Sequence, residues 1–527
     1  EAKYYRDLTA ANDGLLSEDL SDFNLAKGTT NFTLNGGRNE YAIMGWFYRA
    51  AYDYKGKYLA EVNGRYDGTS RFPRGKRYGF FPSFSAAYRI SEEAFFEPLR
   101  KTVDNLKIRL SYGSLGNQQI GYYDFIQTIT TKGSMGDYSF DGTILGQHAT
   151  VSDPVSGNQT WEKVISKNLG ADLNMFSNRL SLTADFYIRD TKGILGKGKS
   201  LPSIYGANEP QVNSNNLRTK GYELVLGWRD SFKLAGSTFS YGITGTFSDY
   251  TAEYTKCDNP SGLIGGPYVG KKYGEIWGYK VDGLFRNDEE AAEYASRVDL
   301  SKVAAGYYSA TGAYGKGVRG GDIKYLDLDG SGIVDGGKGT LEDPGDRRVI
   351  GNSSPRYQYG LTLNLSWYGF DLSVFMQGIG RLDWYPGADN LRFWGPYSRP
   401  YATFIPKNFM SQVWSESNPD AYLPRARAYT SLNSTQGTAY YTNDRYLQNL
   451  AYCRLKNLTL GYTIPKRLTS KVGIKECRVY FSGENLATWS ALKNDFLDPE
   501  QAAADSDKKS NVYPWCRTYS VGLNLTF

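Results

Sequence analysis

Apolar and small or polar residues alternate one by one over the last nine positions of the chain. Successive side chains of a strand point to opposite sides, so the apolar set shares one face. This set consists of Tyr519, Val521, Leu523, Leu525 and Phe527. A soluble sheet that ended on such a strand would leave a long edge open to other chains. The pattern instead favours the closing strand of a transmembrane barrel, with one face in lipid and the other in a polar lumen.

The same period of two recurs along nearly the whole chain. In the clearest case, Leu180, Leu182 and Phe186 alternate with Ser181 and Asp185. Most segments are close to the ~9–11 residues with which a tilted strand spans a bilayer. We therefore predict an all-β fold, a portion of a transmembrane antiparallel β-barrel. Its strands, about thirteen, are expected at 42–53, 57–67, 78–90, 104–113, 164–175, 179–189, 221–230, 238–249, 357–367, 370–380, 450–463, 476–486 and 515–527.

The connections between these segments alternate in length. Short links include 54–56 and 368–369, whereas long ones lie at 114–163, 190–220, 250–356, 381–449 and 487–514. Bacterial barrels place short turns in the periplasm and long loops outside. On this scheme residues 1–41 are the remnant of an extracellular loop and residues 42–527 are the C-terminal part of a barrel. Single-chain bacterial barrels have an even number of strands, so the odd count predicts further strands upstream.

Composition supports a barrel and argues against several other classes. Aromatic residues make up 15% of the chain, with 44 tyrosines, as expected where rings sit at membrane interfaces. No apolar run approaches the ~20 residues of a spanning helix. The net charge of +6, mixed along the chain, gives little support to nucleic-acid binding. One histidine and four scattered cysteines disfavour catalytic triads and zinc sites, so we predict that the protein is not an enzyme.

The segment from Asp327 to Asp335 resembles the first nine positions of an EF-hand-type calcium loop. Oxygen ligands at positions 1, 3, 5 and 9 and a carbonyl at position 7 would come from Asp327, Asp329, Ser331, Asp335 and Ile333. Lys338 stands where the bidentate glutamate belongs, so a later carboxylate would have to complete the shell: Glu342, Asp343 or Asp346. The alternative is an Asp/Gly-rich turn held by side-chain hydrogen bonds without metal. We predict a bound, structural calcium ion.

Aromatic and charged residues concentrate on the predicted external loop 381–449. Flat rings beside guanidinium groups suit the capture of sugars or peptides. The rings could instead pack a small core of the loop itself or line the membrane belt. The candidates for contact with a substrate or with a lid protein are Trp384, Tyr385, Arg392, Phe393, Trp394, Tyr397 and Tyr401.

Several long segments, in order along nearly the whole chain, resemble the SusC/RagA family of TonB-dependent outer-membrane transporters. They are YLAEVNGRYDGTSRF (58–72), GFFPSFSAAYRISEEAFF (79–96), LKIRLSYGSLGNQQIGYYDF (106–125), WEKVISKNLGADLNMFSNRLSLTADFY (161–187), GDIKYLDLDGSGIVD (321–335) and LKNLTLGYTIPKRL (455–468). The match is weakest in the external loops.

The resemblance implies a barrel of about 22 strands in a Gram-negative outer membrane, with an N-terminal plug inside it. It also implies a TonB box and a SusD-like surface lipoprotein that closes over the barrel as a lid. The imported substrates would be oligosaccharides or peptides. The plug, the TonB box and the remaining strands would then lie in an N-terminal part, through which TonB acts.

Further partners follow from the barrel and from the resemblance. The barrel assembly machinery would recognise the terminal strand that carries Tyr519 to Phe527, and lipid and lipopolysaccharide would surround the apolar face. Two alternatives stay open at this point: a secreted or surface β-rich, calcium-containing glycan-binding protein, and a passive porin or adhesin. The choice of substrate is not encoded in any motif that we recognise.

Overall fold

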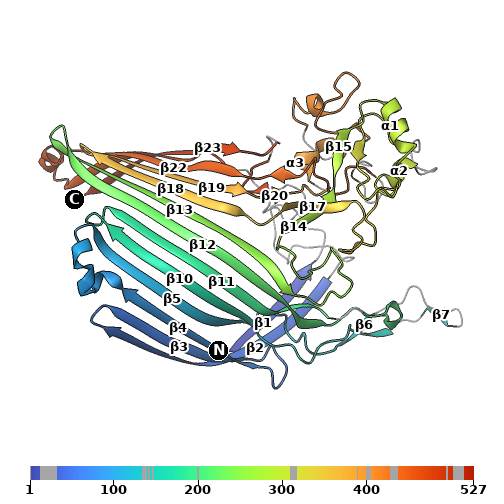
Figure 1. Cartoon of the computed structure of the whole chain (residues 1–527), viewed down its shortest axis with the longest axis horizontal. Coiled ribbons are helices and arrows are strands. Elements are labelled where there is room, and N and C mark those ends of the chain that lie inside the picture. Colours follow the sequence, from blue (N-terminus) through green and yellow to red (C-terminus); the bar gives the residue numbers. More distant parts are fainter. Residues whose placement is uncertain are drawn as a thin grey trace.

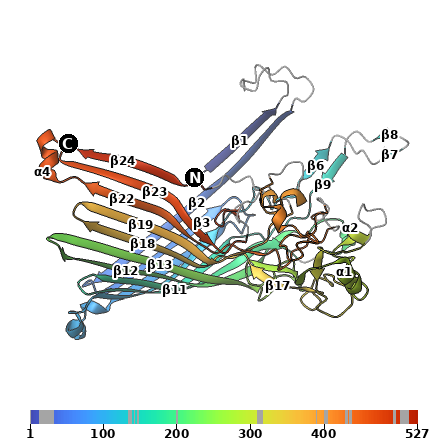
Figure 2. The ribbon, with the colours of Figure 1, turned by 90° about the horizontal axis from the view of Figure 1, so that it is seen from above.

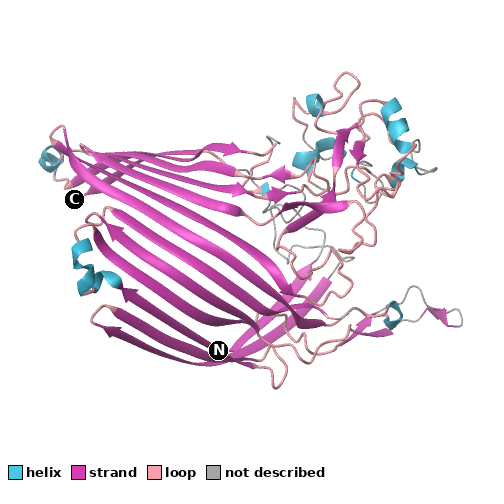
Figure 3. Ribbon diagram, viewed as in Figure 1, coloured by secondary structure: helices cyan, strands magenta, loops and turns pink. Residues whose placement is uncertain are grey.

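The computed structural model describes residues 2–11, 33–132, 139–140, 143–144, 148–198, 201–308, 317–388, 390–398, 405–427, 432, 437–493, 497–502 and 515–527. Fourteen strands form one large antiparallel sheet (Figures 1 and 3). They are β1 (Ala2–Ala11), β2 (Thr33–Tyr54), β3 (Tyr58–Thr69), β4 (Tyr78–Arg89), β5 (Val103–Asn117), β10 (Glu162–Met175), β11 (Leu180–Lys197), β12 (Gln211–Leu234), β13 (Ser237–Lys256), β18 (Arg356–Trp367), β19 (Phe370–Arg381), β22 (Tyr452–Thr463), β23 (Glu476–Ser490) and β24 (Thr518–Thr526).

The strands of this sheet follow one another in chain order, each paired with its predecessor and its successor. Seen from above, the sheet curves like a trough (Figure 2). Within the described residues its two outermost strands, β1 and β24, do not pair with each other. The predicted all-β, antiparallel fold is confirmed.

The N-terminal region differs from the prediction of about thirteen strands preceded by a loop. Residues of β1 pair with the first part of β2, from Ala2 opposite Ala42 to Ala11 opposite Thr33. Strand β3 pairs with the remainder of β2, beginning at Ile43. The β1–β2 hairpin therefore extends past the end of β3 (Figure 2). Strand β1 escaped prediction because its residues, AKYYRDLTAA, carry no continuous apolar face.

Short turns lie at one end of the sheet, the turn end, and long connections at the other, the loop end (Figure 1). The turn between β12 and β13 has two residues, Ala235 and Gly236, with φ of 50° and 86°. Positive φ at both positions matches the twist of a tight antiparallel hairpin. The long strands β11 and β12 also shorten the predicted loop 190–220 to the residues between Lys197 and Gln211.

Four short helices lie at the turn end. They are η2 (Ile90–Glu92), η3 (Ala94–Leu99), α4 (Lys466–Thr469) and η8 (Ser470–Val472). At the loop end, the connection from β5 to β10 carries β6 (Ile129–Lys132), β7 (Ser139–Phe140), β8 (Thr143–Ile144) and β9 (His148–Val151), and η4 (Ser203–Tyr205) follows β11. In the described part of the chain, no helix has the length and apolar character needed to cross a membrane.

The cross-strand register separates an apolar face of the sheet from a polar face. One row of directly opposed residues on eight successive strands is almost entirely aliphatic: Leu106, Leu173, Leu182, Leu226, Gly245, Leu361, Met376 and Leu455. A row on the other face reads Arg109, Gly170, Asp185, Glu223, Ser248 and Gln358. In this row Leu226 and Leu361 are exposed, at 52% and 41%, and the other apolar side chains are half-buried. Such a surface requires an apolar environment.

The two longest connections, from β13 to β18 and from β19 to β22, fold together into one external domain (Figure 1). Its elements are β14 (Glu275–Tyr279), β15 (Val281–Leu284), α1 (Asp288–Ala295), α2 (Ala305–Tyr308), β16 (Ile323–Tyr325), β17 (Arg347–Asn352), β20 (Asp383–Trp384), α3 (Leu391–Trp394), η5 (Gly395–Tyr397), η6 (Met410–Gln412) and β21 (Gln448–Asn449). A single hydrophobic core draws residues from both connections.

Candidate functional site

The aromatic residues predicted to bind a substrate or a lid form much of the core of the external domain. Phe393, Trp394 and Tyr397 have 1%, 0% and 3% of their surfaces exposed. The ring of Trp394 meets that of Tyr446 with centroids 5.0 Å apart. The Asn390 side chain caps α3 by accepting a hydrogen bond from the backbone N–H of Phe393 at 3.0 Å. These three rings are placed as the alternative of a loop core describes, and they leave at most 3% of their surfaces for a ligand or a lid.

The remaining candidates of this group are placed differently. Tyr385 packs against the same core, and its hydroxyl donates to the carbonyl of Tyr441 at 3.0 Å. Trp384 lies in β20 and Arg392 in α3, both partly exposed, so both can meet a partner. Tyr401 lies outside the described residues.

A buried ion pair joins the two connections of the external domain. The Arg427 guanidinium donates to both carboxylate oxygens of Asp322, at 3.0 and 2.5 Å, and stacks over the ring of Tyr307 at 4.2 Å. The Asp322 side chain is 1% exposed and that of Arg427 6%. Burial raises the pKa of Asp322 to about 6, although the positive charge of Arg427 opposes this shift. No sequence pattern indicates this pair, because its partners are 105 positions apart.

The predicted calcium loop brings three carboxylates together, those of Asp327, Asp329 and Asp346. Their ligand atoms lie within 4.8 Å of one another. Of the three carboxylates expected to complete the shell, Asp346 belongs to the group, whereas Glu342 and Asp343 do not. Asp346 is fully buried, which raises its pKa. Like charges this close repel one another unless a cation or protons neutralise them.

The loop is also organised by hydrogen bonds of its own. The Asp327 carboxylate accepts from the backbone N–H groups of Gly330 and Gly332 at 2.8 and 2.9 Å. Asp346 accepts from the N–H groups of Leu328 and Asp335 at 2.6 and 2.9 Å. These bonds fit the alternative of an Asx-type turn, and each carboxylate oxygen retains a second lone pair for a cation.

The other predicted ligands are placed less favourably. The carboxylate of Asp335 lies outside the three-carboxylate group and accepts from the N–H of Gly337 at 2.7 Å. The Ile333 carbonyl accepts a hydrogen bond from the Ser331 hydroxyl at 3.0 Å. Hydrogen bonds from Ser331 lower the pKa of Asp329, so this carboxylate stays ionised. The donor set therefore fits a hard cation through carboxylates, with the contribution of Ser331, Ile333 and Asp335 left as a prediction.

The polar face of the sheet carries paired charges between neighbouring strands. The Arg109 guanidinium bridges Asp172 and Asp185, each at 2.9 Å. Arg478 pairs with Asp371 at 2.5 Å. A hollow of about 410 Å³ includes Arg109 in its lining, together with Asp53, Glu61, Lys107 and other residues. A face of this kind suits an aqueous lumen.

A second ionic cluster ties the connection between β23 and β24 to the sheet. Arg454, whose side chain is 2% exposed, bonds to Asp498 and, at 2.7 Å, to Glu500. Lys456 reaches the same Glu500 at 2.7 Å. The cluster fixes part of this connection against the strands that it joins.

The predicted assembly signal lies on β24, apart from Phe527, which follows the end of the strand. Val521 faces Phe481 and Leu523 faces Val479, so they extend the apolar face. Val521 and Phe527 are 79% and 72% exposed. Recognition by assembly machinery stays a prediction.

Comparison with known proteins agrees with this geometry. The family described as "TonB dependent receptor-like, beta-barrel" matches residues 2–486. The chain is 26% identical over 535 residues to TonB-dependent receptor P3 of Formosa agariphila, covering 97% of this chain and 48% of that protein. It is 23% identical over 500 residues to TonB-dependent receptor SusC of Bacteroides thetaiotaomicron, covering 92% and 44%. The chain thus spans about half the length of the curated relatives that it matches.

A solved structure of the RagAB peptide transporter has the same fold, with a TM-score of 0.72 and 20% identity over 100% of this chain and 52% of that chain. The relatives are named as receptors and transporters, in keeping with the prediction that this chain is not an enzyme. The resemblance to SusC and RagA inferred from the sequence is confirmed. The chain belongs to the TonB-dependent receptor-like β-barrel family.

Proposed function

We propose that this chain is part of a TonB-dependent transporter that imports oligosaccharides or peptides across a Gram-negative outer membrane. The observation that carries the proposal is the division of one long sheet into an exposed apolar face and a charge-paired face. The apolar face would meet lipid and the charged face a polar lumen. A soluble glycan-binding protein would have to cover this apolar surface with a second layer.

We infer that the complete transporter includes a plug and further strands, and that TonB acts on that plug. The SusC and RagAB likenesses support a surface lipoprotein as the partner, and the external domain is the surface that we assign to it. Deleting residues 384–401 is a poor test of this contact, because the deletion would remove core residues and unfold the domain. The exposed Met410 (68%) offers a cleaner test, because Met410→Glu changes the surface alone.

The transporter proposal is tested with the full-length protein in its own membrane. We expect a heat-modifiable band on detergent gels and uptake of an oligosaccharide or peptide that stops when TonB is removed. Uptake that persists without TonB would favour a passive porin. A protein that is extracted without detergent would overturn the barrel.

We propose that the carboxylates of Asp327, Asp329 and Asp346 hold a structural calcium ion that stiffens the external domain. The convergence of three carboxylates, one of them fully buried, supports this assignment. Calorimetry should show calcium binding to the full-length protein, lost in Asp329→Ala. The matched control is Asp343→Ala, an exposed carboxylate outside the group. Equal calcium heats for the two variants, or none in the wild type at millimolar calcium, would contradict the site.

A further inference from the structure

A shallow pocket of about 650 Å³ lies over β5, β10, β11, β12 and β13, toward the loop end of the apolar face. Two neighbouring rows of the register frame it. The row nearer the turn end contains Leu110, Leu169, Phe186, Tyr222 and Asp249. The row nearer the loop end contains Tyr112, Lys167, Ile188, Lys220 and Thr251. The pocket therefore sits where aliphatic and aromatic rows give way to lysines.

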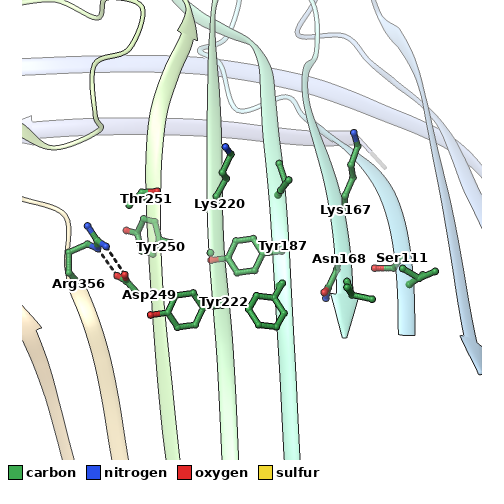
Figure 4. A pocket seen from close by; sticks show the side chains of 15 residues that line it. Ser111, Lys167, Asn168, Tyr187, Lys220, Tyr222, Asp249, Tyr250, Thr251 and Arg356 are labelled. Atoms are coloured by element: carbon green, nitrogen blue, oxygen red, sulfur yellow. Dashed lines mark hydrogen bonds and ion pairs between the residues drawn. The ribbon is translucent and has the colours of Figure 1, made fainter. Parts of the chain in front are cut away.

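Lys167 and Lys220 lie in one row, separated by Ile188 on the strand between them. Adjacent strands are about 4.8 Å apart, so the two lysine backbones are about 10 Å from each other. In Figure 4 both side chains extend in the same direction, beyond the ring of Tyr222. Within the described part of the chain neither lysine forms an ion pair. Two long ammonium groups can thus converge on one anion.

The other charged residues in the pocket lining and in the next row toward the loop end are already compensated. Arg356 donates to both oxygens of Asp249 at 2.6 Å (Figure 4). Next to the lysine row, Arg218 pairs with Asp190 at 2.6 Å. Glu253, which lies near Lys220, pairs with Lys272. The local excess is therefore the positive charge of Lys167 and Lys220.

We propose that Lys167 and Lys220 bind the phosphate of a lipid A-type glycolipid whose acyl chains run over Leu169, Phe186 and Tyr222. Lysines placed beside an apolar surface attract anionic lipid head groups, and the hollow below them accepts hydrocarbon. This inference rests on the proposed function, because only an outer-membrane barrel with its long loops outside would place the loop end in the outer leaflet, where such glycolipids reside. Phosphate on a phospholipid would share the chemistry, and the test separates the two.

The alternative explanation is that both lysines simply extend toward water, as long cationic side chains do at membrane interfaces. The full-length transporter, purified in detergent, would be titrated with lipid A, with dephosphorylated lipid A and with phosphatidylglycerol, and binding followed by native mass spectrometry. The test variant is Lys167→Gln/Lys220→Gln. The matched control is Lys107→Gln/Arg189→Gln, which removes two charges from the opposite face of β5 and β11, the strands next to those that carry the two lysines.

We expect lipid A to bind the test variant roughly 30-fold more weakly. Each lysine near a lipid surface contributes about 1 kcal/mol, and about 1.4 kcal/mol corresponds to a tenfold change in Kd. The control should bind like the wild type, and dephosphorylated lipid A should not distinguish the proteins. Equal affinity of both variants for lipid A would overturn the site. Phosphatidylglycerol binding as tightly, with the same loss in the test variant, would overturn the choice of glycolipid. Heat modifiability, measured on the same samples, reports separately on whether the protein is a barrel.

Discussion

The ion pair between Asp322 and Arg427 should decide whether the two connections of the external domain stay together. Replacing Arg427 with Met preserves much of the packing on Tyr307 but removes the ionic partner of Asp322, whose side chain is only 1% exposed. Removing one member of a buried pair costs about 3–5 kcal/mol. The Arg319 N–H still donates to Asp322 at 2.8 Å, which favours the lower end of that range. We therefore expect the free energy of opening of the domain to fall by about 3 kcal/mol.

Native-state hydrogen exchange measures this opening, because the amides of β16 report on the domain while those of the barrel strands report on the sheet. Arg425→Met is the matched control: Arg425 pairs with Asp288 at 3.8 Å, and the Asp288 side chain is 57% exposed. A pair of this kind contributes at most about 1 kcal/mol. If the two variants lower the protection of β16 equally, or if Arg427→Met lowers protection in the barrel strands as much as in β16, the reasoning is refuted.

Three further predictions concern the sheet and the external domain. Leu226→Arg places a charge on the apolar face, which should destabilise the folded barrel by about 2–4 kcal/mol and reduce the folded yield in membranes. Val225→Arg, on the opposite face, should be tolerated. The amount of heat-modifiable protein measures the folded yield of both variants. Ala235→Gly should raise the free energy of unfolding by about 1 kcal/mol in urea titrations, because Ala235 has a φ of 50°. Because the pKa of Asp322 is raised from 3.8 to about 6, the folded domain binds a proton more tightly than the open one. Its protection against exchange should therefore fall as pH rises from about 4 to 6 and level off above, and Asp322→Asn should abolish this part of the pH dependence.

The sheet could be predicted from sequence because membrane strands obey a local rule. Alternation with period two located every strand of the large sheet from β2 to β24, since each must present one face to an apolar surface. Strand β1 was missed because adjacent Tyr4 and Tyr5, with charges around them, break that alternation.

The external domain could be predicted only in part. The calcium-type motif is contiguous, and Asp346 was one of three carboxylates expected to complete it. Whether Trp394 faces solvent or a core depends on Tyr446, which lies 52 residues later in the sequence. The pair Asp322–Arg427 likewise exists only once both connections have folded. No periodicity or spacing in a single sequence encodes contacts between residues that lie so far apart along the chain.

The shared core of the external domain has a consequence for how barrels of this family can diversify. The domain is connected to β13, β18, β19 and β22, which are neighbours in the sheet. It therefore links the loop ends of four adjacent strands. A graft of either connection alone would carry half of the core and half of the Asp322–Arg427 pair into a foreign host. Residues 257–451, which hold both connections and both members of the pair, would therefore have to be exchanged together by recombination or by an engineer.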